Sequence, residues 1–364
     1  MMQLKQPIDY AKAACETMMR KFEAPKLPPV GHFHYHQGVF LSGVYQTYLL
    51  TKDERYFNYM KAWVDSIVAK EDGRIHWYDP GELDDMQPGI LLFPLYERTG
   101  ESCYRKAIGD LMERIDHYPK NAAGGFYHKE CCPQQMWLDG LYMGGPLCTL
   151  YGAAFGEPKY FDIAAQQALL MEEKTKDPKT GLWYHAWDEA RLQPWADKET
   201  GLSSEFWGRS IGWVPVAILD EMDLIPEDHP LYPELKRLVT ELLTAVCKYQ
   251  SEDGRWYQVV DKGDKEGNWL ENSCSCLFAA ALAKAVRKGF LPESYLEKAK
   301  RGYEGVIRSI TWEGEDIQIG NICIGTCVGD YKHYCERPVS TNDLHGAGAF
   351  LLMNTELQRA LDVR

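Results

Sequence analysis

Two kinds of apolar segment alternate along the chain. In the first kind, apolar and small residues follow one another almost without a break, which is typical of a helix buried on all sides. In the second kind, apolar residues recur at helical spacing with Lys and Glu between them, which predicts a helix with one buried side. The fully apolar segments begin at His36, Asp84, Trp137, Trp207, Asn272 and Asn342. The amphipathic segments lie near residues 8–22, 53–70, 101–115, 157–174, 230–249 and 293–310.

These segments form a repeat whose copies start 48 to 70 residues apart, which is long enough for a helix pair and a loop. The amphipathic helix is the outer member of each pair. The first outer segment (8–22) has no inner segment before it, and the last inner segment (342–357) has no outer segment after it. Pairing these two ends would close a ring. The sequence therefore predicts an all-α (α/α)6 barrel, with residues 1–364 forming a single domain.

The connections from an outer segment to the next inner one share a signature of Gly, then aromatic residues, then His or Gln. Such Gly-bounded aromatic runs predict short β-hairpins. The signature occurs as GRIHWY (73–78), GFYH (125–128), GLWYH (181–185) and GRWYQ (254–258). In the predicted topology these loops and the starts of the inner helices share one face of the barrel. Their polar and aromatic side chains should therefore surround one mouth.

The composition narrows the classes of function. A net charge of −13 disfavours a nucleic-acid-binding surface, and it means that an anionic substrate would need a local cationic group. No apolar run approaches the roughly 20 residues of a membrane span, and the start MMQLKQPIDY does not resemble a secretory signal. The 11 cysteines are scattered and odd in number, which favours reduced thiols over a disulfide framework. We therefore expect a cytoplasmic protein that binds neither membrane nor nucleic acid.

Tryptophans are prominent around the expected mouth. Indole faces match the flat C–H faces of sugar rings, although core packing explains any single Trp equally well. As a set placed beside Asp and His residues, they favour a carbohydrate-binding cleft. The set comprises Trp77, Trp137, Trp183, Trp187, Trp207 and Trp213.

Asp139, in MWLDGLYMGGP, is the strongest candidate for a catalytic acid. Its apolar flanks, such as Leu138 and Leu141, predict a desolvated carboxyl group whose pKa is raised, as a general acid requires. Asp is also a frequent N-cap, a role that would stabilise the anion instead. Asp84 lies at the matching place one repeat earlier, and paired carboxylates across a cleft are typical of glycosidic chemistry. The neighbouring Asp85 is better explained as a helix cap.

Three further residues suit an anionic sugar. Arg209, in FWGRSIGW, offers a planar fork for a carboxylate, although a structural pair with Glu205 is the alternative. His128 and His185 would hydrogen-bond the substrate or tune the acid, unless they are histidines satisfied within the core.

The motif at 32–36, His-x-His-x-His, would place three imidazoles on one side of a strand. No Cys pair or HExxH motif accompanies it, so we expect no metal site.

Several of these segments occur together in a known family. The chain resembles the unsaturated rhamnogalacturonyl hydrolases of glycoside hydrolase family 105, and more distantly the unsaturated glucuronyl hydrolases of family 88. The resemblance rests on FYHKECCPQQMWLDGLYMGGPL, LWYHAWDEA, FWGRSIGWVPVAILD, ENSCSCLFAAALAKAVRKGFL and CIGTCVGDYKHYCERPVSTNDLHGAGAFLL. It covers roughly residues 30–360 and implies the same (α/α)6 barrel. One departure is Ser210-Ile211, where the family is expected to have Gly-Asn, and this puts the aglycone subsite in question.

The resemblance implies an intracellular enzyme, without metal or organic cofactor, that removes a 4,5-unsaturated uronic acid from lyase-generated oligosaccharides. Rhamnose is the expected neighbour of the uronate. In this chemistry an acid protonates C4 of the C4=C5 vinyl ether, water adds at C5, and the ring opens and releases the aglycone. The resemblance assigns the acid to Asp139 and the second carboxylate to Asp84. It places around the substrate His128, Trp137, His185, Trp207, Arg209 and Trp213.

Some alternatives stay open. Tyr35 and His36, at the start of the first inner segment, are further candidates for substrate binding, but the sequence does not decide between site and core. An unsaturated glucuronyl hydrolase with another aglycone would share this site. A sugar epimerase should show two catalytic His residues on facing inner helices, and a lyase should show a strong base such as Tyr or Lys. A non-catalytic carbohydrate-binding toroid would need the tryptophans but not Asp139. The oligomeric state is undetermined.

Overall fold

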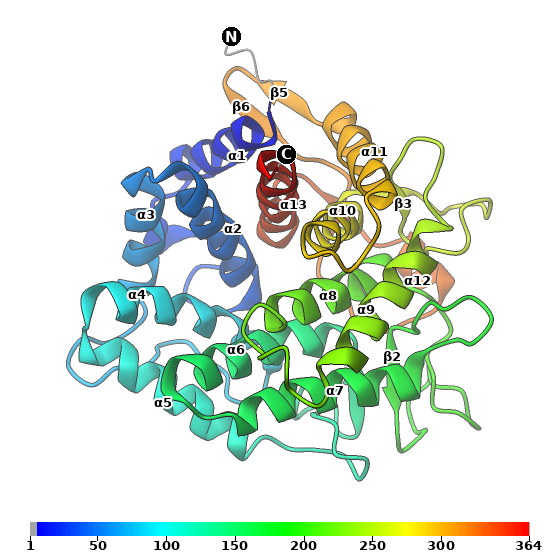
Figure 1. The fold of residues 1–364 in the computed structure, drawn as a ribbon, viewed down its shortest axis with the longest axis horizontal. Helices are drawn as coiled ribbons and strands as arrows, with labels where there is room; N and C mark the ends of the chain where they lie inside the picture. Colours follow the sequence, from blue (N-terminus) through cyan, green and yellow to red (C-terminus); the bar gives the residue numbers. More distant parts are fainter. Residues whose placement is uncertain (1–5, 364) are drawn as a thin grey trace.

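In the computed structural model, which describes residues 6–363, six inner helical segments surround a common axis and six outer helices cover them (Figure 1). The outer helices are α1 (Pro7–Lys21), α3 (Glu54–Asp65), α5 (Ser102–Asp116), α7 (Lys159–Thr175), α9 (Tyr232–Cys247) and α11 (Ser294–Ser309). The inner helices are α2 (Tyr35–Thr51), α4 (Leu92–Thr99), α6 (Asp139–Phe155), α8 (Gly208–Glu221), α10 (Asn272–Arg287) and α13 (Leu344–Asp362). A short 3₁₀ helix, η1 (Ala24–Lys26), follows α1.

The inner segments form a closed ring. Helix α13 packs against both α10 and α2, and α6 packs against α8 as well as the segment that precedes α4. Helix α1 lies beside α13 and so joins the two ends of the described chain (Figure 1). One continuous apolar core extends from Ala11 of α1 to Ala360 of α13. The predicted (α/α)6 barrel, including the pairing of its ends, is confirmed.

The second inner segment departs from the predicted helix starting at Asp84. It consists of two 3₁₀ turns, η2 (Leu83–Asp85) and η3 (Gln87–Leu91), before the short α4. Pro88 lacks the N–H that an α-helical turn uses, so the chain tightens into 3₁₀ geometry here. A Cβ added at Gly89 would lie 2.6 Å from Leu111 of α5, so the tight approach to the outer helix also depends on glycine.

Short antiparallel strands lie in the loops, and the predicted hairpin forms at 254–258, whereas the other aromatic runs differ from the prediction. Strand β1 (Gln135–Trp137) pairs with β2 (Ala186–Asp188) of a different loop, and β3 (Trp256–Tyr257) pairs with β4 (Leu270–Glu271). The aromatic runs at 73–78, 125–128 and 181–185 contribute only single bridges back to the end of the preceding outer helix or just beyond it.

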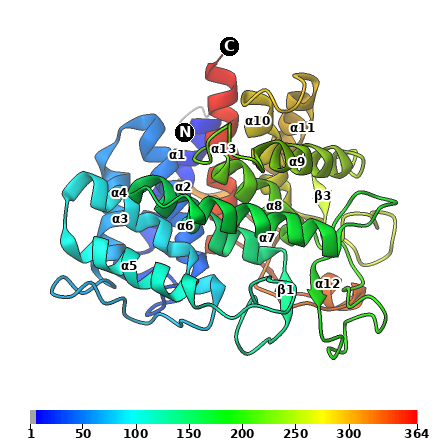
Figure 2. The same cartoon turned by 60° about the horizontal axis from the view of Figure 1, so that its bottom comes forward.

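The longest connection, between α11 and α13, carries the remaining strands. They are β5 (Thr311–Glu313) with β6 (Asp316–Gln318), and β7 (Ile322–Cys323) with β8 (Val339–Ser340). The one-turn helix α12 (Tyr331–Cys335) lies between the last two strands. Seen from the side, β1 and α12 gather at one end of the barrel (Figure 2). The connections therefore build a polar layer over that end.

Ring closure depends on close contact between α13 and α2. A Cβ at Gly348 would lie 2.6 Å from the backbone carbon of Val39 and 2.7 Å from the backbone nitrogen of Phe40, neither of which can rotate away. We expect Gly348→Ala to lower the free energy of unfolding by about 2–3 kcal/mol, as overpacking does. Chemical denaturation would measure the change.

The control for that substitution is Gly109→Ala in α5. A Cβ there meets nothing closer than the Arg105 side chain at 3.6 Å. Since Gly weakens a helix by roughly 0.5–1 kcal/mol relative to Ala, this variant should be as stable as the wild type or slightly more stable. Equal stability of both variants would contradict the close packing of α13 on α2.

Candidate active site

A cavity of about 260 Å³ lies where the starts of α2, α6 and α8 meet the segment 325–337. Its wall contains most of the residues that the sequence singled out. Those residues are Tyr35, His36, Asp84, His128, Trp137, Asp139, Trp207 and Arg209. The structure thus places Tyr35 and His36, left undecided by the sequence, on the cavity wall.

Asp139 is the first residue of α6, but its side chain does not cap the helix. Its Oδ2 lies 3.1 Å from Nε2 of His185, and Nδ1 of His185 lies 2.7 Å from the hydroxyl of Tyr334. That hydroxyl accepts a hydrogen bond from the backbone N–H of Gly329, so its own proton is available for Nδ1. This arrangement leaves the Nε2 proton of His185 for Asp139. Tyr334 therefore fixes the tautomer that faces the candidate acid.

The environment of Asp139 corrects one expectation. Burial favours a raised pKa, as predicted, but the hydrogen bond from His185 and the electrostatic influence of the His185 and His128 imidazoles oppose it, and the net pKa lies below the usual value. In the unliganded protein Asp139 is therefore a carboxylate at neutral pH. The sequence could not reveal this because His185 comes from a different loop.

Asp84 is held as an anion by two basic neighbours. Burial would raise its pKa, but His128 and Lys129 outweigh that effect and lower it to about 2. Lys129 Nζ lies 3.0 Å from one oxygen of Asp84, and His128 Nε2 lies 3.5 Å from the other. His128 also stacks on Trp137, with ring centroids 4.4 Å apart, and burial lowers its own pKa. Asp84 is thus placed to accept hydrogen bonds from hydroxyl groups or water in the cavity.

Arg209 is a buried cation that forms no ion pair with a carboxylate of the described residues. Its Nη1 donates to the carbonyl of Cys323 at 2.5 Å and its Nη2 donates to that of Ile324 at 2.8 Å. The guanidinium lies over the ring of Trp207 at 4.5 Å. The alternative partner, Glu205, contacts Lys262 instead. Because its charge is not neutralised, Arg209 is suited to an anionic ligand.

Two predicted contact residues lie away from the cavity surface. His185 is fully buried behind Asp139, where it positions the acid instead of lining the cavity. Trp213 is also fully buried and stacks on Tyr142 at 4.7 Å within the core. Trp213 follows Arg209 by one turn on the same side of α8, and this turn places it deeper in the barrel than the cavity. The predicted contact of these two residues with substrate is therefore not supported by their placement.

The atypical pair Ser210-Ile211 also lies in the core. Both residues are fully buried, and the Ser210 hydroxyl donates to the carbonyl of Trp207 at 2.9 Å. Neither residue lines the cavity. The departure from the family pattern therefore lies in the packing of α8 and not on the cavity wall.

The histidines at 32–36 do not form the strand that would align them. His34 precedes α2 and its Nδ1 lies 2.6 Å from Asp85, whose other oxygen accepts from the backbone N–H of Asp79. Asp85 thus ties a loop to α2, which corrects its interpretation as a helix cap. His36 lies within α2 and faces α13.

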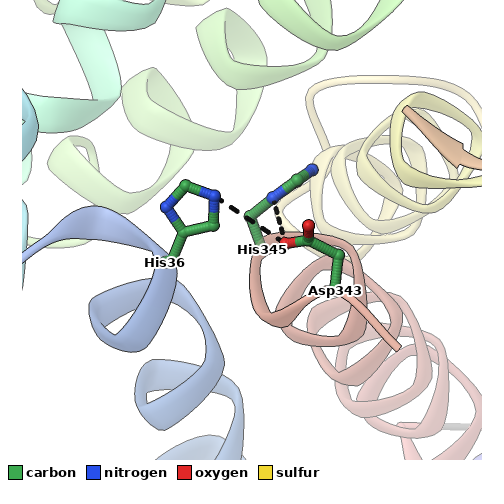
Figure 3. A group of neighbouring side chains, drawn as sticks. All are labelled: His36, Asp343 and His345. Carbon is green, nitrogen blue, oxygen red and sulfur yellow. Dashed lines mark ion pairs between the residues drawn. The ribbon is translucent and has the colours of Figure 1, made fainter. Parts of the chain in front are cut away.

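A second polar group lies at the start of α13 (Figure 3). Asp343 Oδ1 is 2.7 Å from Nδ1 of His345 and 3.7 Å from Nε2 of His36, and both imidazoles contribute to an Asp343 pKa far below its usual value despite burial. The other nitrogen of His345 donates to the carbonyl of Cys323 at 3.0 Å. These three ligand atoms lie within 4.8 Å of one another, as do those of His34, Glu82 and Asp85. The expectation of no metal stays a prediction.

Several wall residues were not singled out from the sequence. Besides Tyr334 behind the wall, they are Lys129, Thr326, His333 and Arg337. Most belong to the long connection before α13, which carries no helical period. Lys129 could have been predicted as a site residue, because it follows the candidate His128 in the sequence.

Comparison with known proteins decides the family. A family model described as Glycosyl Hydrolase Family 88 matches residues 10–361. The chain belongs to Glycosyl Hydrolase Family 88. This family 88 chain is a glycoside hydrolase, and the predicted resemblance to families 105 and 88 is confirmed.

Individual relatives agree with that assignment. The family 88 chain is 36% identical to a solved glycoside hydrolase of family 105 from C. acetobutylicum, with a TM-score of 0.92 over 96% of this chain and 99% of that one. It is 28% identical over 297 residues to the unsaturated rhamnogalacturonyl hydrolase YesR of Bacillus subtilis, covering 80% of this chain and 79% of the relative. An unsaturated glucuronyl hydrolase from Bacillus sp. GL1 shares the fold, with a TM-score of 0.72 at 18% identity over 97% and 96% of the two chains.

Within residues 6–363, no helix has the length and apolar character that crossing a membrane requires.

Proposed function

We propose that this family 88 hydrolase removes a 4,5-unsaturated uronic acid from the end of an oligosaccharide by hydrating the C4=C5 bond. The observation that carries the proposal is the pairing of two inward-facing carboxylates, Asp139 and Asp84, with the unpaired buried cation Arg209 in one cavity. An anionic sugar would need a cation such as Arg209, and protonation of a vinyl ether would need an acid such as Asp139. Rhamnose is the proposed neighbour, supported by the name of the relative from Bacillus subtilis.

Asp139 donates its proton to C4 of the substrate. The C4=C5 electron pair forms the new C4–H bond, and the positive charge left at C5 is shared with the ring oxygen. Water then forms a bond to C5 and returns one proton to Asp139, which gives a hemiketal. The hemiketal opens to a C5 ketone, and the hemiacetal left at C1 collapses to an aldehyde and releases the aglycone as an alcohol. The net reaction consumes one water, and C1 is not attacked.

The remaining residues position the substrate for this step. Arg209 pairs with the uronate carboxylate, and the ring of Trp207 beneath it holds the guanidinium in place. Asp84 accepts hydrogen bonds from ring hydroxyls or from the attacking water, and Lys129 and His128 keep it ionised. The pair His185 and Tyr334 holds the Asp139 carboxyl in place.

Binding of the substrate should change the protonation of Asp139. The pKa of its carboxyl is low in the free protein, and a second carboxylate brought into the cavity would raise it by like-charge repulsion. The acid form is required for the reaction, so the rate falls as pH rises through the relevant pKa. The pH dependence of kcat/KM reports the pKa in the free enzyme, and that of kcat reports the pKa in the complex. We therefore expect kcat to decline at a higher pH than kcat/KM does. Steady-state rates across a pH series would check this. A decline of kcat and kcat/KM at the same pH would contradict it.

The direct test follows the ultraviolet absorbance of a lyase-generated unsaturated disaccharide. Hydration destroys the conjugated C4=C5 bond, so absorbance should be lost with time. Comparison of uronyl-rhamnose with uronyl-hexosamine would separate the proposed aglycone from that of a glucuronyl hydrolase. A rise in absorbance with a saturated polymer would indicate a lyase. Absorbance unchanged with every unsaturated disaccharide would overturn the proposal and favour an epimerase or a non-catalytic toroid.

We also propose that the enzyme acts in the cytoplasm on small imported saccharides. All 11 cysteines fall within the described residues, and each is a free thiol, with Cys131 and Cys132 having sulfurs 3.9 Å apart. Reduced thiols suit that compartment.

A further inference from the structure

An open groove of about 710 Å³ runs outward from the cavity. The cavity and the groove share three lining residues, His34, His36 and Lys129, so one continues into the other. If the uronate occupies the cavity, the rest of the oligosaccharide has to leave it through an opening. The groove is such an exit.

Trp77 lies in the wall of this groove and is unusually exposed. Its relative exposure is 60%, whereas Trp183, Trp207 and Trp213 are at most 1% exposed. An indole that is mostly exposed forgoes much of the stabilisation that burial of a large apolar side chain provides. Packing within this chain therefore does not explain why a tryptophan occupies this position.

The backbone of Trp77 is also strained. Its φ angle is 55°, in the left-handed region that side chains other than Gly, Asn and Asp seldom adopt. The conformation is held because the carbonyl of Trp77 accepts from the N–H of Phe33 at 3.1 Å, while the N–H of the preceding His76 donates to Ile67 at 2.9 Å. Strain of this kind gathers at ligand-binding sites. Gly31 lies beside the indole, where a Cβ would come within 3.8 Å of it, so glycine leaves the ring less covered than a larger residue would.

The polar groups of the groove suit a neutral sugar. Asp79, Glu82 and Asp85 provide hydrogen-bond acceptors, and Lys129 is the single Lys or Arg among the described lining residues. Lys129 is already paired with Glu82 and Asp84. His34 in turn lies against Asp85, so the carboxylates here still outnumber the cations. A second uronate in the groove would therefore be repelled, whereas sugar hydroxyls would find acceptors.

We propose that Trp77 is the stacking platform of a saccharide subsite in this groove, which binds a neutral pyranose ring on the leaving-group side of the uronate. The subsite rests on the proposed function for the identity of the uronate, but binding of a neutral sugar at Trp77 is testable without turnover. This subsite explains the exposed indole, its strained backbone and the continuity of the groove with the cavity.

The kinetic test compares two substrates of the wild type and Trp77→Ala. One is unsaturated uronyl-rhamnose, and the other is the methyl glycoside of the same unsaturated uronate, which has no second ring. Stacking on an aromatic side chain is worth about 0.5–1.5 kcal/mol beyond burial, so we expect KM for uronyl-rhamnose to rise about 3- to 10-fold, with kcat nearly unchanged. The methyl glycoside should show no change. Equal effects on both substrates, or no effect on either, would overturn the subsite.

Two controls separate stacking from structure. Trp312→Ala removes another exposed indole, 42% exposed on β5, and should leave both substrates unaffected. Trp77→Gly relieves the strained φ, so its melting temperature should equal or exceed that of the wild type while KM rises as in Trp77→Ala. A melting temperature that falls together with affinity would assign Trp77 a structural role instead.

Failure of the proposed function would be recognised separately. If the wild type turns over neither substrate, calorimetric titration with the rhamnose-containing disaccharide still tests the groove. Weaker binding by Trp77→Ala than by Trp312→Ala would retain the subsite without the hydrolase chemistry. Equal binding by the two variants would reject the subsite.

Discussion

Asp139→Asn should lower kcat by about 100- to 10,000-fold, the range that a positioned general acid contributes. The amide cannot supply the proton for C4, yet its oxygen can still accept the hydrogen bond from Nε2 of His185, now at 3.1 Å from Asp139. The cavity should therefore keep its shape and KM should change little. The measurement is loss of absorbance of the unsaturated disaccharide under saturating conditions, with thermal melting as a check on folding.

A matched control is Asp53→Asn. Asp53 caps α3 by accepting from the N–H of Arg55, and Asn caps helices about as well as Asp. This variant should retain full activity. Activity that persisted in Asp139→Asn would leave the hydration chemistry in place but would remove Asp139 from the role of acid.

Arg209→Met should lower kcat/KM by about 100- to 1,000-fold, mostly through a higher KM. The change removes a two-point, charge-assisted contact with the uronate, worth roughly 1.5–3 kcal/mol for each hydrogen bond to a charged group. Arg209→Lys keeps the charge but loses the fork, so it should recover only part of the loss.

The test of that role uses the methyl ester of the same substrate, which lacks the negative charge. If Arg209 pairs with the uronate, the ester should bind poorly to the wild type and the substitution should then cost little more. Arg209 also anchors the backbone carbonyls of Cys323 and Ile324. An equal loss with acid and ester would show that this anchoring is the whole of its contribution.

The arrangement of helices could be predicted from the sequence because a helix buried on all sides and a helix buried on one side have different patterns of apolar residues. The alternation of these two patterns, with one unpaired segment at each end, predicts the topology of the ring. The second inner segment escaped this reasoning in detail. Its apolar composition is that of a helix, but Pro88 and the close approach at Gly89 convert its first half to 3₁₀ turns.

The chemistry of the site was less accessible because it depends on contacts between distant loops. The apolar neighbours of Asp139 in sequence predicted a raised pKa. The net lowering comes from His185, 46 residues away, which is itself oriented by Tyr334, a further 149 residues along. The placement of Trp213 could not be predicted either: the family resemblance assigned it to the uronate, but it lies one turn beyond Arg209 along α8, where it stacks on Tyr142 in the core.

The pairing of α1 with α13 has a consequence for synthesis on the ribosome. The N–H of Ile8 donates to the side chain of Gln358, a contact between residues 350 positions apart. Helix α13 leaves the ribosome after every other helix of the barrel, and it brings Asp343 and His345 against His36 of the cavity wall. Until then the nascent chain is an open arc whose first and last inner helices expose apolar sides. The barrel should therefore acquire both its stability and its activity late and together, and the unfinished arc is the stage at which protection from aggregation matters most.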